Sequence, residues 1–490
     1  MHERPGSRRR HALLALLVAV IAALVASGPA AAQNVIVVIA DDLGVDALAA
    51  YGEQPLVANT PTIDELASNG VLFRNAWAYP VCSPFRVSVM LGQHPSAHGA
   101  GYAINGKMAG RDYMLDSAAP NLANLLGAAG YRTAAIGKWH MGVTAGFRFG
   151  DLFDGAPSLT ELLPIFAGFQ RFAGDLFVCS DEYSDWCKTV NGVSRVMPTY
   201  VTTDIANEAL SQLSGTEPFF LWLAFRSPHT PFHEPPHALL EDPTVYDFTD
   251  SGDRFRAMIE AMDTELGRVL DAVNWSDTTV IFVADNGTHR AVIQPRVQEQ
   301  RAKGTVYEGG LNVPLIIAGQ AVADAGRGRE SAALVQATDL FGTILDVAGV
   351  EVPSRRDVVS LAPYLADPAT PSRRLTIFSE SFLPNRGPID PALHNRAARG
   401  IRYKLVRRGT GPDEMYDLGL DPFEQSPLDL ERLTPLQAGA HARLDAAINS
   451  RRLGATTPVP VLGVPGLALL ALLCGVAAVS ATSGARQRQI

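Results

Sequence analysis

The sequence predicts an α/β fold: a doubly wound, mainly parallel sheet flanked by helices, with a smaller C-terminal α+β domain. Short apolar runs rich in β-branched residues, of which Asn34–Ala40 is the clearest, are typical of strands buried on both faces of a parallel sheet. Segments of helical periodicity alternate with these runs, as the crossovers of a parallel sheet require. After about residue 366 the strands shorten and turn residues increase, which indicates a second architecture.

The elements are predicted in this order. Strands are expected at Asn34–Ala40, Arg132–Ile136, Phe219–Phe225, Thr279–Ala284 and Leu311–Ala318, and helices at Thr62–Asn69, Asn121–Ala129, Phe255–Val273 and Thr338–Ala348. Two shorter strands, Leu375–Ser379 and Ile401–Val406, precede a turn-rich end. Residues 145–200 are rich in aromatic side chains and give no regular assignment. We expect an α/β domain over 33–365 and the smaller domain over 366–450.

Both ends of the chain have their own composition. Three arginines, an apolar run and a Pro-Ala-Ala-Ala segment make residues 1–32 resemble a cleavable export signal, with a membrane anchor as the alternative. Residues 451–490 are predicted to be a linker and an apolar segment that ends in two arginines. This end resembles a bacterial C-terminal sorting tag of the PEP-CTERM kind; a plain tail anchor and a buried helix are the alternatives. We therefore expect an exported protein of the periplasm or cell surface, associated with a membrane through this tail.

The charge of the chain excludes one class of partner. Without the four Arg and one Glu of residues 1–32, 37 basic residues face 49 acidic ones, a net charge of −12 against −9 for the whole chain. A chain this acidic is a poor candidate for binding nucleic acid, and an anionic substrate would need a local basic pocket.

The stretch Val81–Arg86 (Val-Cys-Ser-Pro-Phe-Arg) is expected to be a loop that turns into a buried helix. Pro84 suits a first helical turn, because its φ is preset and its missing N–H would be unpaired there. Cys82 would then lie at a helix N-terminus, which favours an anion, with Arg86 one turn further on. A small buried cysteine is the alternative.

The other cysteines leave Cys82 as the odd thiol. Cys179 and Cys187 are spaced to form one disulfide in an oxidising compartment, and Cys474 lies in the apolar tail. This count favours a chemical use for Cys82.

Oxygen ligands follow two of the predicted strands. Asp41 and Asp42 end the first, and Asp285 and Asn286 end the strand at 279–284. Because ligands bind at the carboxyl ends of strands in such sheets, we expect these side chains to meet. A set of oxygen ligands without histidine selects Ca²⁺ or Mg²⁺ over Zn²⁺. Each pair alone would more often be a cap or a turn.

Basic and imidazole side chains accompany them. Lys138, His140, His229 and Lys303 also lie at strand ends or beside glycines. Two lysines and Arg86 converging on a pocket in an acidic protein indicate that the bound group is a small oxyanion.

With these motifs in order, the chain resembles the formylglycine-dependent sulfatases of the alkaline-phosphatase superfamily. The resemblance rests on Ile39–Asp42, Cys82-x-Pro84-x-Arg86, Gly137-Lys138-Trp139-His140, Ala224–Pro231, Met258–Val273, Asp285-Asn286-Gly287, Lys303–Pro314 and Glu414–Leu418, which span residues 34 to about 430. The chain departs from the family pattern at Phe85, Leu91 and Arg226.

The resemblance implies a mechanism. A formylglycine-generating enzyme would oxidise Cys82 to formylglycine (3-oxoalanine), whose hydrate attacks sulfur with one hydroxyl. Asp41, Asp42, residue 82, Asp285 and Asn286 would hold Ca²⁺, with Mg²⁺ as the alternative. Lys138, Lys303 and Arg86 would neutralise the sulfate, His229 and Lys303 would stabilise the leaving alkoxide, and His140 would take the proton of the second hydroxyl.

The substrate class implied is a small-molecule or carbohydrate sulfate ester. Two other functions compete with it. One is a phosphonate monoester or phosphodiester hydrolase on the same scaffold. The other is a surface protein that has lost catalysis and binds sulfated polymers, for which Cys82 would stay unmodified.

Overall fold

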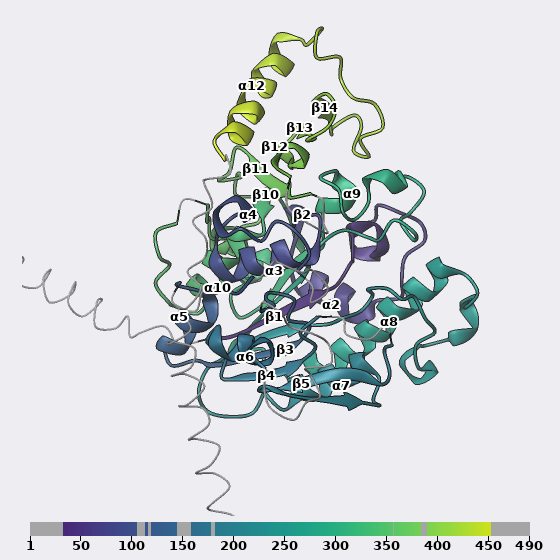
Figure 1. Ribbon diagram of the computed structural model, residues 1–490, viewed down its shortest axis with the longest axis vertical. Helices are drawn as coiled ribbons and strands as arrows, with labels where there is room; N and C mark the ends of the chain where they lie inside the picture. The colour runs from purple at the N-terminus through teal and green to yellow at the C-terminus, as the bar shows by residue number, and fades with distance from the viewer. Residues whose placement is uncertain are drawn as a thin grey trace, which may run out of the picture.

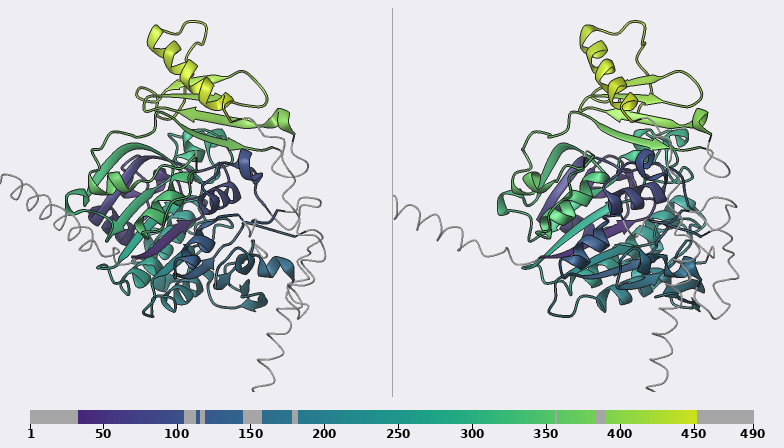
Figure 2. Two further views of the ribbon diagram at one scale, coloured as in Figure 1. Left: turned by 90° about the vertical axis from the view of Figure 1, so that its left-hand side faces the viewer. Right: turned by 60° about the vertical axis from the view of Figure 1, so that its left-hand side comes forward.

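A computed structural model of the chain describes residues 33–104, 113–115, 119–144, 158–177, 182–355, 357–383 and 390–451. Its largest element is a ten-stranded sheet in the order β10-β2-β9-β8-β1-β7-β3-β4-β5-β6. Helices cover both faces of this sheet (Figure 1). A separate four-stranded antiparallel sheet, in the order β11-β12-β13-β14, lies at one end of the molecule together with the last helix (Figure 2). The predicted fold class is confirmed.

The central strands form because their side chains are apolar on both faces. β1 (Asn34–Ala40) pairs in parallel with β7 (Phe219–Ala224) on one side and β8 (Thr278–Ala284) on the other. Apart from Asn34, every residue of these three strands is buried. β3 (Arg132–Gly137) continues the parallel set beside β7. Four carboxyl strand ends therefore lie next to one another at one edge of the sheet.

The flanks of the sheet are mixed. β4 (Arg171–Gly174) runs parallel to β3, and β5 (Trp186–Val190) and β6 (Val193–Met197) extend it as an antiparallel hairpin. On the other flank β9 (Leu315–Gly319) is antiparallel to β8 and to β2 (Gly70–Trp77), and β10 (Arg329–Gln336) is parallel to β2. The small sheet contains β11 (Ile377–Ser381), β12 (Asn395–Arg399), β13 (Tyr403–Arg407) and β14 (Glu414–Asp417).

Helices in contact with one another make up the two covering layers. α3, α5 and α10 contact one another, and α8 contacts both α2 and α7. The α-helices are α2 (Pro61–Asn69), α3 (Cys82–Leu91), α4 (Pro95–His98), α5 (Leu122–Ala128), α6 (Leu159–Phe166), α7 (Val201–Leu210), α8 (Ser251–Leu270), α9 (Glu308–Leu311), α10 (Thr338–Val347), α11 (Ala362–Ala366) and α12 (Pro435–Asn449). Short 3-10 turns are η1 (Val45–Ala47), η2 (Ala49–Tyr51), η4 (His237–Leu239), η5 (Pro243–Val245), η6 (Glu299–Arg301), η7 (Asp324–Gly326) and η8 (Pro391–Leu393).

Several predicted elements need correction. α8 starts at Ser251, before the predicted Phe255, because the Asp250 side chain caps it by accepting from the Asp253 N–H. The strand predicted from Leu311 starts at Leu315, because the preceding residues form the short helix α9. The end expected to be rich in turns contains α12, whose first turn is closed by a Thr434–Gln437 capping box.

The predicted segment 1–32 and all but the first residue of the predicted segment 451–490 lie outside the described residues. In the part of the chain that is described, no helix is long and apolar enough to cross a bilayer. The proposed disulfide partner Cys179 also lies outside the described residues, while Cys187 is disulfide-bonded. The Cys179–Cys187 pairing therefore stays a prediction, and Cys82 is a free, buried thiol.

Candidate active site

The candidate site lies where the parallel strands end. Asp41 and Asp42 follow β1, Lys138 follows β3, His229 follows β7, and Asp285 and Asn286 follow β8. Because these four strands are neighbours in the sheet, residues far apart in sequence come within contact distance. The backbone is locally constrained here: Asp42 and His140 have φ values of 70° and 54°, a left-handed conformation uncommon for residues with a Cβ.

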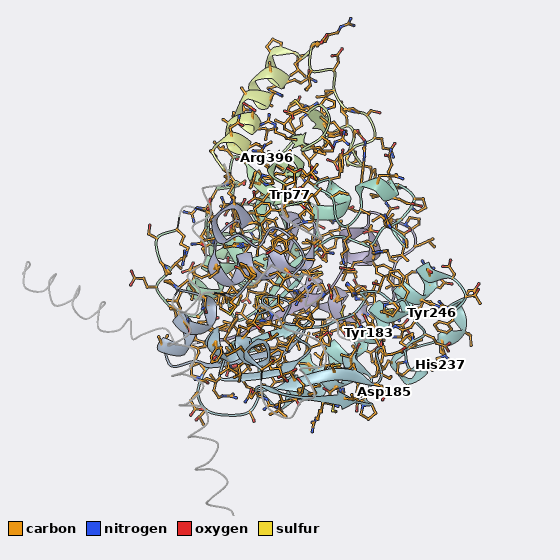
Figure 3. All side chains as sticks on the ribbon, viewed as in Figure 1. Trp77, Tyr183, Asp185, His237, Tyr246 and Arg396 are labelled. Atoms are coloured by element: carbon orange, nitrogen blue, oxygen red, sulfur yellow. The ribbon has the colours of Figure 1, made fainter. Side chains whose placement is uncertain are left out.

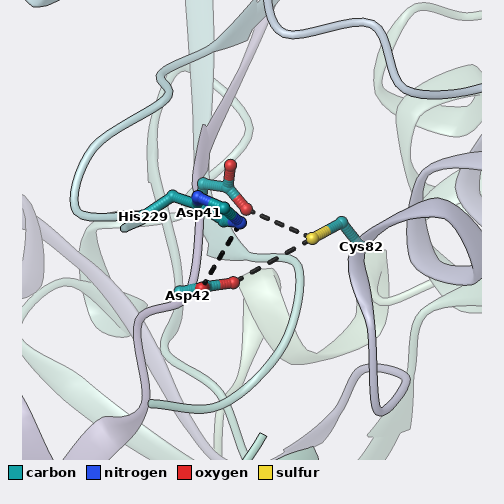
Figure 4. Close-up of side chains that lie close together, drawn as sticks. All are labelled: Asp41, Asp42, Cys82 and His229. Carbon is teal, nitrogen blue, oxygen red and sulfur yellow. Dashed lines mark hydrogen bonds and ion pairs between the residues drawn. The ribbon is translucent and has the colours of Figure 1, made fainter. Parts of the chain in front are cut away.

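Cys82 faces this edge from the first residue of α3, as predicted. All ten residues of α3 are buried, so packing on every side fixes the start of the helix. The Cys82 Sγ lies 3.3 Å from Asp41 Oδ1 and 3.9 Å from Asp42 Oδ1 (Figure 4). Lys138 Nζ and Lys303 Nζ lie 3.5 and 3.9 Å from the same sulfur. The thiol is thus surrounded by two carboxylates and two ammonium groups.

Each cation also pairs with a carboxylate. Lys138 Nζ contacts Asp41 Oδ2, and Lys303 Nζ lies 2.5 and 2.6 Å from the two carboxyl oxygens of Asp42. We call Asp41, Asp42, Cys82, Arg86, Lys138, Asp285, Asn286 and Lys303 the Cys82 cluster.

Arg86 completes this cluster from α3. Its guanidinium donates to Asp285 Oδ2 at 2.9 and 2.7 Å and to the Lys138 carbonyl at 2.7 Å. Arg86 therefore contacts residues at the ends of two strands, β8 and β3. A buried guanidinium that holds a carboxylate and a carbonyl at once cannot change place without breaking both contacts.

The pKa values of Asp41 and of the Cys82 thiol shift in opposite directions. Burial raises the pKa of Asp41, but the charges of Lys138, His229, Arg86 and Lys303 outweigh it and hold the value well below normal. Burial raises the pKa of the Cys82 thiol well above its usual value, and the charges of Asp285 and Asp41 add to that effect. The thiol is therefore protonated at neutral pH and is a poor nucleophile as it stands.

Atoms in and beside the Cys82 cluster could serve as ligands for a divalent cation. One ligand atom each from Asp41, Asp42, Cys82 and His229 lie within 4.8 Å of one another. The buried Oδ1 of Asn286 has no hydrogen-bond partner among the described residues, while its Nδ2 donates to Asp42 Oδ1 at 2.9 Å. The Asn286 oxygen is thus available as a ligand beside two carboxylates. Such a set of oxygen atoms suits Ca²⁺ or Mg²⁺, which take oxygen ligands.

The two histidines differ in their contacts with this cluster. His229 Nδ1 donates to the Thr230 carbonyl at 2.8 Å, which leaves Nε2 facing Asp42 Oδ2 at 3.8 Å (Figure 4). Burial lowers the pKa of His229 to about 4, against the opposing charge of Asp42. The His140 ring is buried, and its Nδ1 has no hydrogen-bond partner among the described residues. Every predicted site residue is thus at this edge, with His140 outside the direct contacts of the cluster.

Two further residues at this edge were missed from the sequence. Asp175 directly follows β4 and is buried, and neither carboxyl oxygen has a hydrogen-bond partner among the described residues. The rule that pointed to Asp41 would have pointed to Asp175 if β4 had been predicted. Tyr183 lies in a loop before β5 and hydrogen-bonds to the backbone of the His229 segment. No local sequence signal marks that contact.

Comparison with protein families finds two matches. Residues 33–350 match the family model described as Sulfatase, and residues 301–449 match the one described as N-sulphoglucosamine sulphohydrolase, C-terminal. Among curated proteins, Arylsulfatase J of Mus musculus is 24% identical over 335 residues, covering 64% of this chain and 52% of that protein. Steryl-sulfatase of Mus musculus is 28% identical over 563 residues, covering 91% and 87%. N-acetylgalactosamine-6-sulfatase of Rattus norvegicus is 28% identical over 373 residues, covering 69% of this chain and 66% of that protein.

Solved structures share the fold at low identity. The PsFucS1 sulfatase from Pseudoalteromonas sp. superposes with a TM-score of 0.68 at 21% identity, covering 93% of this chain and 96% of that one. The structure of BT4656 in complex with its substrate D-glucosamine-2-N,6-O-disulfate has a TM-score of 0.66 at 19% identity, covering 87% and 99%. Ps i-CgsB in complex with k-i-k-neocarrahexaose gives 0.69 at 21%, covering 86% and 94%.

Proposed function

The chain belongs to the sulfatase family, and on that premise we propose that it is a sulfuric ester hydrolase whose nucleophile forms at Cys82. The observation that carries the proposal is the placement of the Cys82 Sγ. It lies at the start of a buried helix, within 4 Å of two carboxylates and two ammonium groups. A protonated thiol in this position has little use as a nucleophile, which favours its conversion to formylglycine by a formylglycine-generating enzyme.

The cations suit a tetrahedral oxyanion. Lys138, Lys303 and Arg86 approach position 82 from β3, from the loop before α9 and from α3. Because all three are held by ion pairs, their charges are already in place when an ester binds and need no reorganisation as charge develops. This arrangement stabilises the sulfuryl group during transfer.

Asp41, Asp42, Asp285 and Asn286 would hold the divalent cation, with residue 82 as a further ligand. When bound, Ca²⁺ or Mg²⁺ would supply Lewis-acid stabilisation of the sulfate oxygens and favour ionisation of the attacking hydroxyl. The oxygen ligands come from the ends of β1 and β8, two strands paired along their whole length, so the fold presets their spacing.

Formylglycine would supply a hydrated aldehyde with two hydroxyls, one to attack sulfur and one whose deprotonation releases sulfate. His140 follows Lys138 by two positions, and its buried Nδ1 has no hydrogen-bond partner in the part of the chain that the structure describes, so we assign it the removal of that second proton. His229 and Lys303 lie next to Asp42, and we assign them the leaving oxygen. The Lys303 ammonium would give that oxygen its proton, and His229 would donate from Nε2 as the imidazolium, because its Nδ1–H is bound to the Thr230 carbonyl. General acid–base assistance of this kind contributes roughly 10²–10⁴-fold.

A carbohydrate sulfate ester is the substrate class we favour. Its support is the likeness to two structures that contain carbohydrates, D-glucosamine-2-N,6-O-disulfate in one and k-i-k-neocarrahexaose in the other. Export and membrane association through the ends of the chain are further proposals that rest on the sequence patterns alone, and fractionation of host cells tests both.

A chelation experiment tests the proposed function. Exhaustive chelation should abolish hydrolysis of 4-nitrophenyl sulfate, and Ca²⁺ or Mg²⁺ should restore it. Activity that survives chelation, or that only Zn²⁺ restores, contradicts the oxygen-ligand assignment. A higher kcat/KM on bis(4-nitrophenyl) phosphate than on the sulfate would favour a phosphodiesterase. Absence of turnover together with an unmodified Cys82 would favour a binding protein.

A further inference from the structure

A tyrosine outside the predicted site holds the backbone of the segment that carries His229. Tyr183 is 4% exposed and lies in the lower half of the molecule in Figure 3. Its hydroxyl lies 2.6 Å from the His229 carbonyl and 3.1 Å from the Arg226 carbonyl. Since carbonyl oxygens only accept, the two contacts share the single O–H proton of the phenol, and the shorter contact is to His229.

The segment that contains Tyr183 and the segment that contains Arg226 and His229 also contact each other through Arg226. Arg226 Nη1 donates to the Glu182 carbonyl at 3.0 Å, and its guanidinium lies 4.6 Å from the centre of the Tyr183 ring. The Val201 N–H donates to the Tyr183 carbonyl at 2.8 Å. On its other side the Tyr183 ring packs against His233, with ring centres 4.1 Å apart. These contacts hold the backbone and the ring of Tyr183 in place, so its hydroxyl has a defined position.

His229 depends on these contacts for its orientation. Its ring is bound through Nδ1 to the carbonyl of the next residue, Thr230, so the ring direction follows the local backbone. That backbone is held at the His229 carbonyl by Tyr183. The consequence is that Nε2 points to Asp42 and the candidate reaction centre, with only a fifth of the side chain exposed.

We propose that Tyr183 is a positioning residue that keeps His229 Nε2 aimed at the leaving oxygen of the sulfate ester. The inference rests on the proposed function and extends it to a residue that does not touch substrate. Loss of the hydroxyl would release the His229 carbonyl and widen the range of positions of the imidazole. A small misplacement of a catalytic group lowers rate by up to roughly 10²-fold.

The chain contains a matched control for this hydroxyl. Tyr131 is 2% exposed, and its hydroxyl also donates to two backbone carbonyls, Gln33 at 2.9 Å and Ala348 at 2.8 Å. It precedes β3, so it lies at the opposite edge of the sheet from the candidate site. Tyr131→Phe removes the same group from the same kind of environment without any contact to His229.

The test compares two aryl sulfates on the full chain. With 4-nitrophenyl sulfate, whose leaving group needs little protonation, Tyr183→Phe should lower kcat/KM no more than about threefold. With phenyl sulfate, a poorer leaving group, it should lower kcat/KM roughly 10- to 100-fold. Tyr131→Phe should affect both substrates equally. In a His229→Gln background, Tyr183→Phe should have no further effect on phenyl sulfate. Equal losses on both substrates, no loss, or an undiminished loss in the His229→Gln background would each overturn the inference.

A second measurement is independent of catalysis. In protein with ¹⁵N-labelled histidine, His229 should show one tautomer with a protonated Nδ1, and Tyr183→Phe, unlike Tyr131→Phe, should convert this signal to an exchange-averaged one. An unchanged signal overturns the positioning role. If the wild-type protein hydrolyses neither sulfate, the proposed function fails, and the histidine signal still decides whether Tyr183 positions the ring.

Discussion

Two buried charge clusters in this protein have opposite characters. The Cys82 cluster lies at the carboxyl edge of the large sheet. The second, which we call the junction cluster, joins the large sheet to the small one and contains Trp77, Glu308, Arg399, Lys404 and Glu424. Figure 3 labels Trp77 near the boundary between the two sheets. Both clusters combine carboxylates with cations in the interior, and they differ in the kind of polar atom that is left without a hydrogen-bond partner.

In the junction cluster every carboxylate oxygen has a partner. Glu308 accepts from Trp77 Nε1 at 3.1 Å and pairs with Arg399 at 2.5 Å and Lys404 at 3.1 Å. Glu424 pairs with Lys404 at 2.8 Å and accepts from the Glu308 N–H at 2.5 Å. Lys404 Nζ also lies 4.8 Å from the centre of the Trp77 ring. These contacts bind the two sheets together. The buried Arg399 Nε has no hydrogen-bond partner among the described residues, and Glu424 Oε1 is held by the Lys404 ion pair alone.

The Cys82 cluster leaves ligand atoms open. Asn286 Oδ1 and, beside the cluster, His140 Nδ1 are buried without a partner among the described residues. Because unsatisfied buried polar atoms cost free energy, a fold retains them where a ligand or reaction intermediate satisfies them. The difference teaches that buried charge alone does not mark a site. Leftover atoms that can bind a cation or a proton, such as Asn286 Oδ1 and His140 Nδ1, do, whereas the leftover Arg399 Nε–H can only donate.

Replacing Cys82 by Ser should have the largest effect on activity. One hydroxyl can attack sulfur, but no second hydroxyl remains to expel the sulfate, so we expect at most one turnover per site. The side chains are nearly equal in size, so the melting temperature should change little. A burst assay with 4-nitrophenyl sulfate and the mass of the peptide containing residue 82 check this. Multiple turnovers at the wild-type rate would contradict the two-hydroxyl mechanism.

Lys138→Met should break the Cys82 cluster without unfolding the protein. Lys138 contacts both Asp41 and Cys82, so we expect kcat/KM to fall by roughly 10²–10³, as when one preorganised oxyanion donor is removed. With Ca²⁺ bound, Asp41 still faces a cation, and the free energy of unfolding should stay close to wild type. The free energy of unfolding of this variant should fall below the wild-type value only after chelation. Equal destabilisation with and without Ca²⁺ would show that Asp41 is not a ligand.

Lys404→Met is the matched substitution in the junction cluster. It leaves Glu424 and part of Glu308 buried without their cation, and breaking a buried pair in this way costs about 3–5 kcal/mol. Denaturant unfolding should show this loss regardless of Ca²⁺, while kcat per folded molecule stays at the wild-type value. A fall in kcat without a fall in stability would mean that the junction cluster serves the reaction.

Ending the chain after Arg451 should have the smallest effect. The last described contacts of the small sheet come from α12 and from Arg451, whose guanidinium lies over the Phe378 ring, and the site lies wholly before them. The shortened protein should keep both kcat/KM and melting temperature, while its distribution between soluble and membrane fractions of host cells changes. Failure of this protein to fold would show that residues after 451 contribute to the core.

The sequence was most informative where a strand is buried on both faces. Asn34–Ala40 and the strand at 279–284 are continuous apolar runs, and the residues that follow them are the oxygen ligands that we propose. That link made the site predictable together with the fold. β2 and β10 escaped prediction because each mixes polar with apolar residues. Arg74 of β2 and Glu330 of β10 pair at 2.5 Å across 256 positions, which no local pattern records.

The other omissions have similar causes. β4 has four residues, too few for a period to show, so the strand end that holds Asp175 was not predicted. α12 buries Ala440, Leu444 and Ile448, but further alanines lie around the rest of the helix, so no apolar face stands out in the sequence. Its capping box was a usable local signal. Tyr183 depends on two loops meeting in space, and such tertiary contacts leave no mark in either segment.

The central claim is that position 82 is a formylglycine in the active protein. The most direct test is the mass of the peptide containing residue 82, from protein purified from its own host. The account predicts the loss of mass that accompanies conversion of a CH₂SH side chain to an aldehyde, and aldehyde-reactive hydrazide should capture that peptide. An intact cysteine in a preparation that turns over 4-nitrophenyl sulfate many times per site would contradict the account.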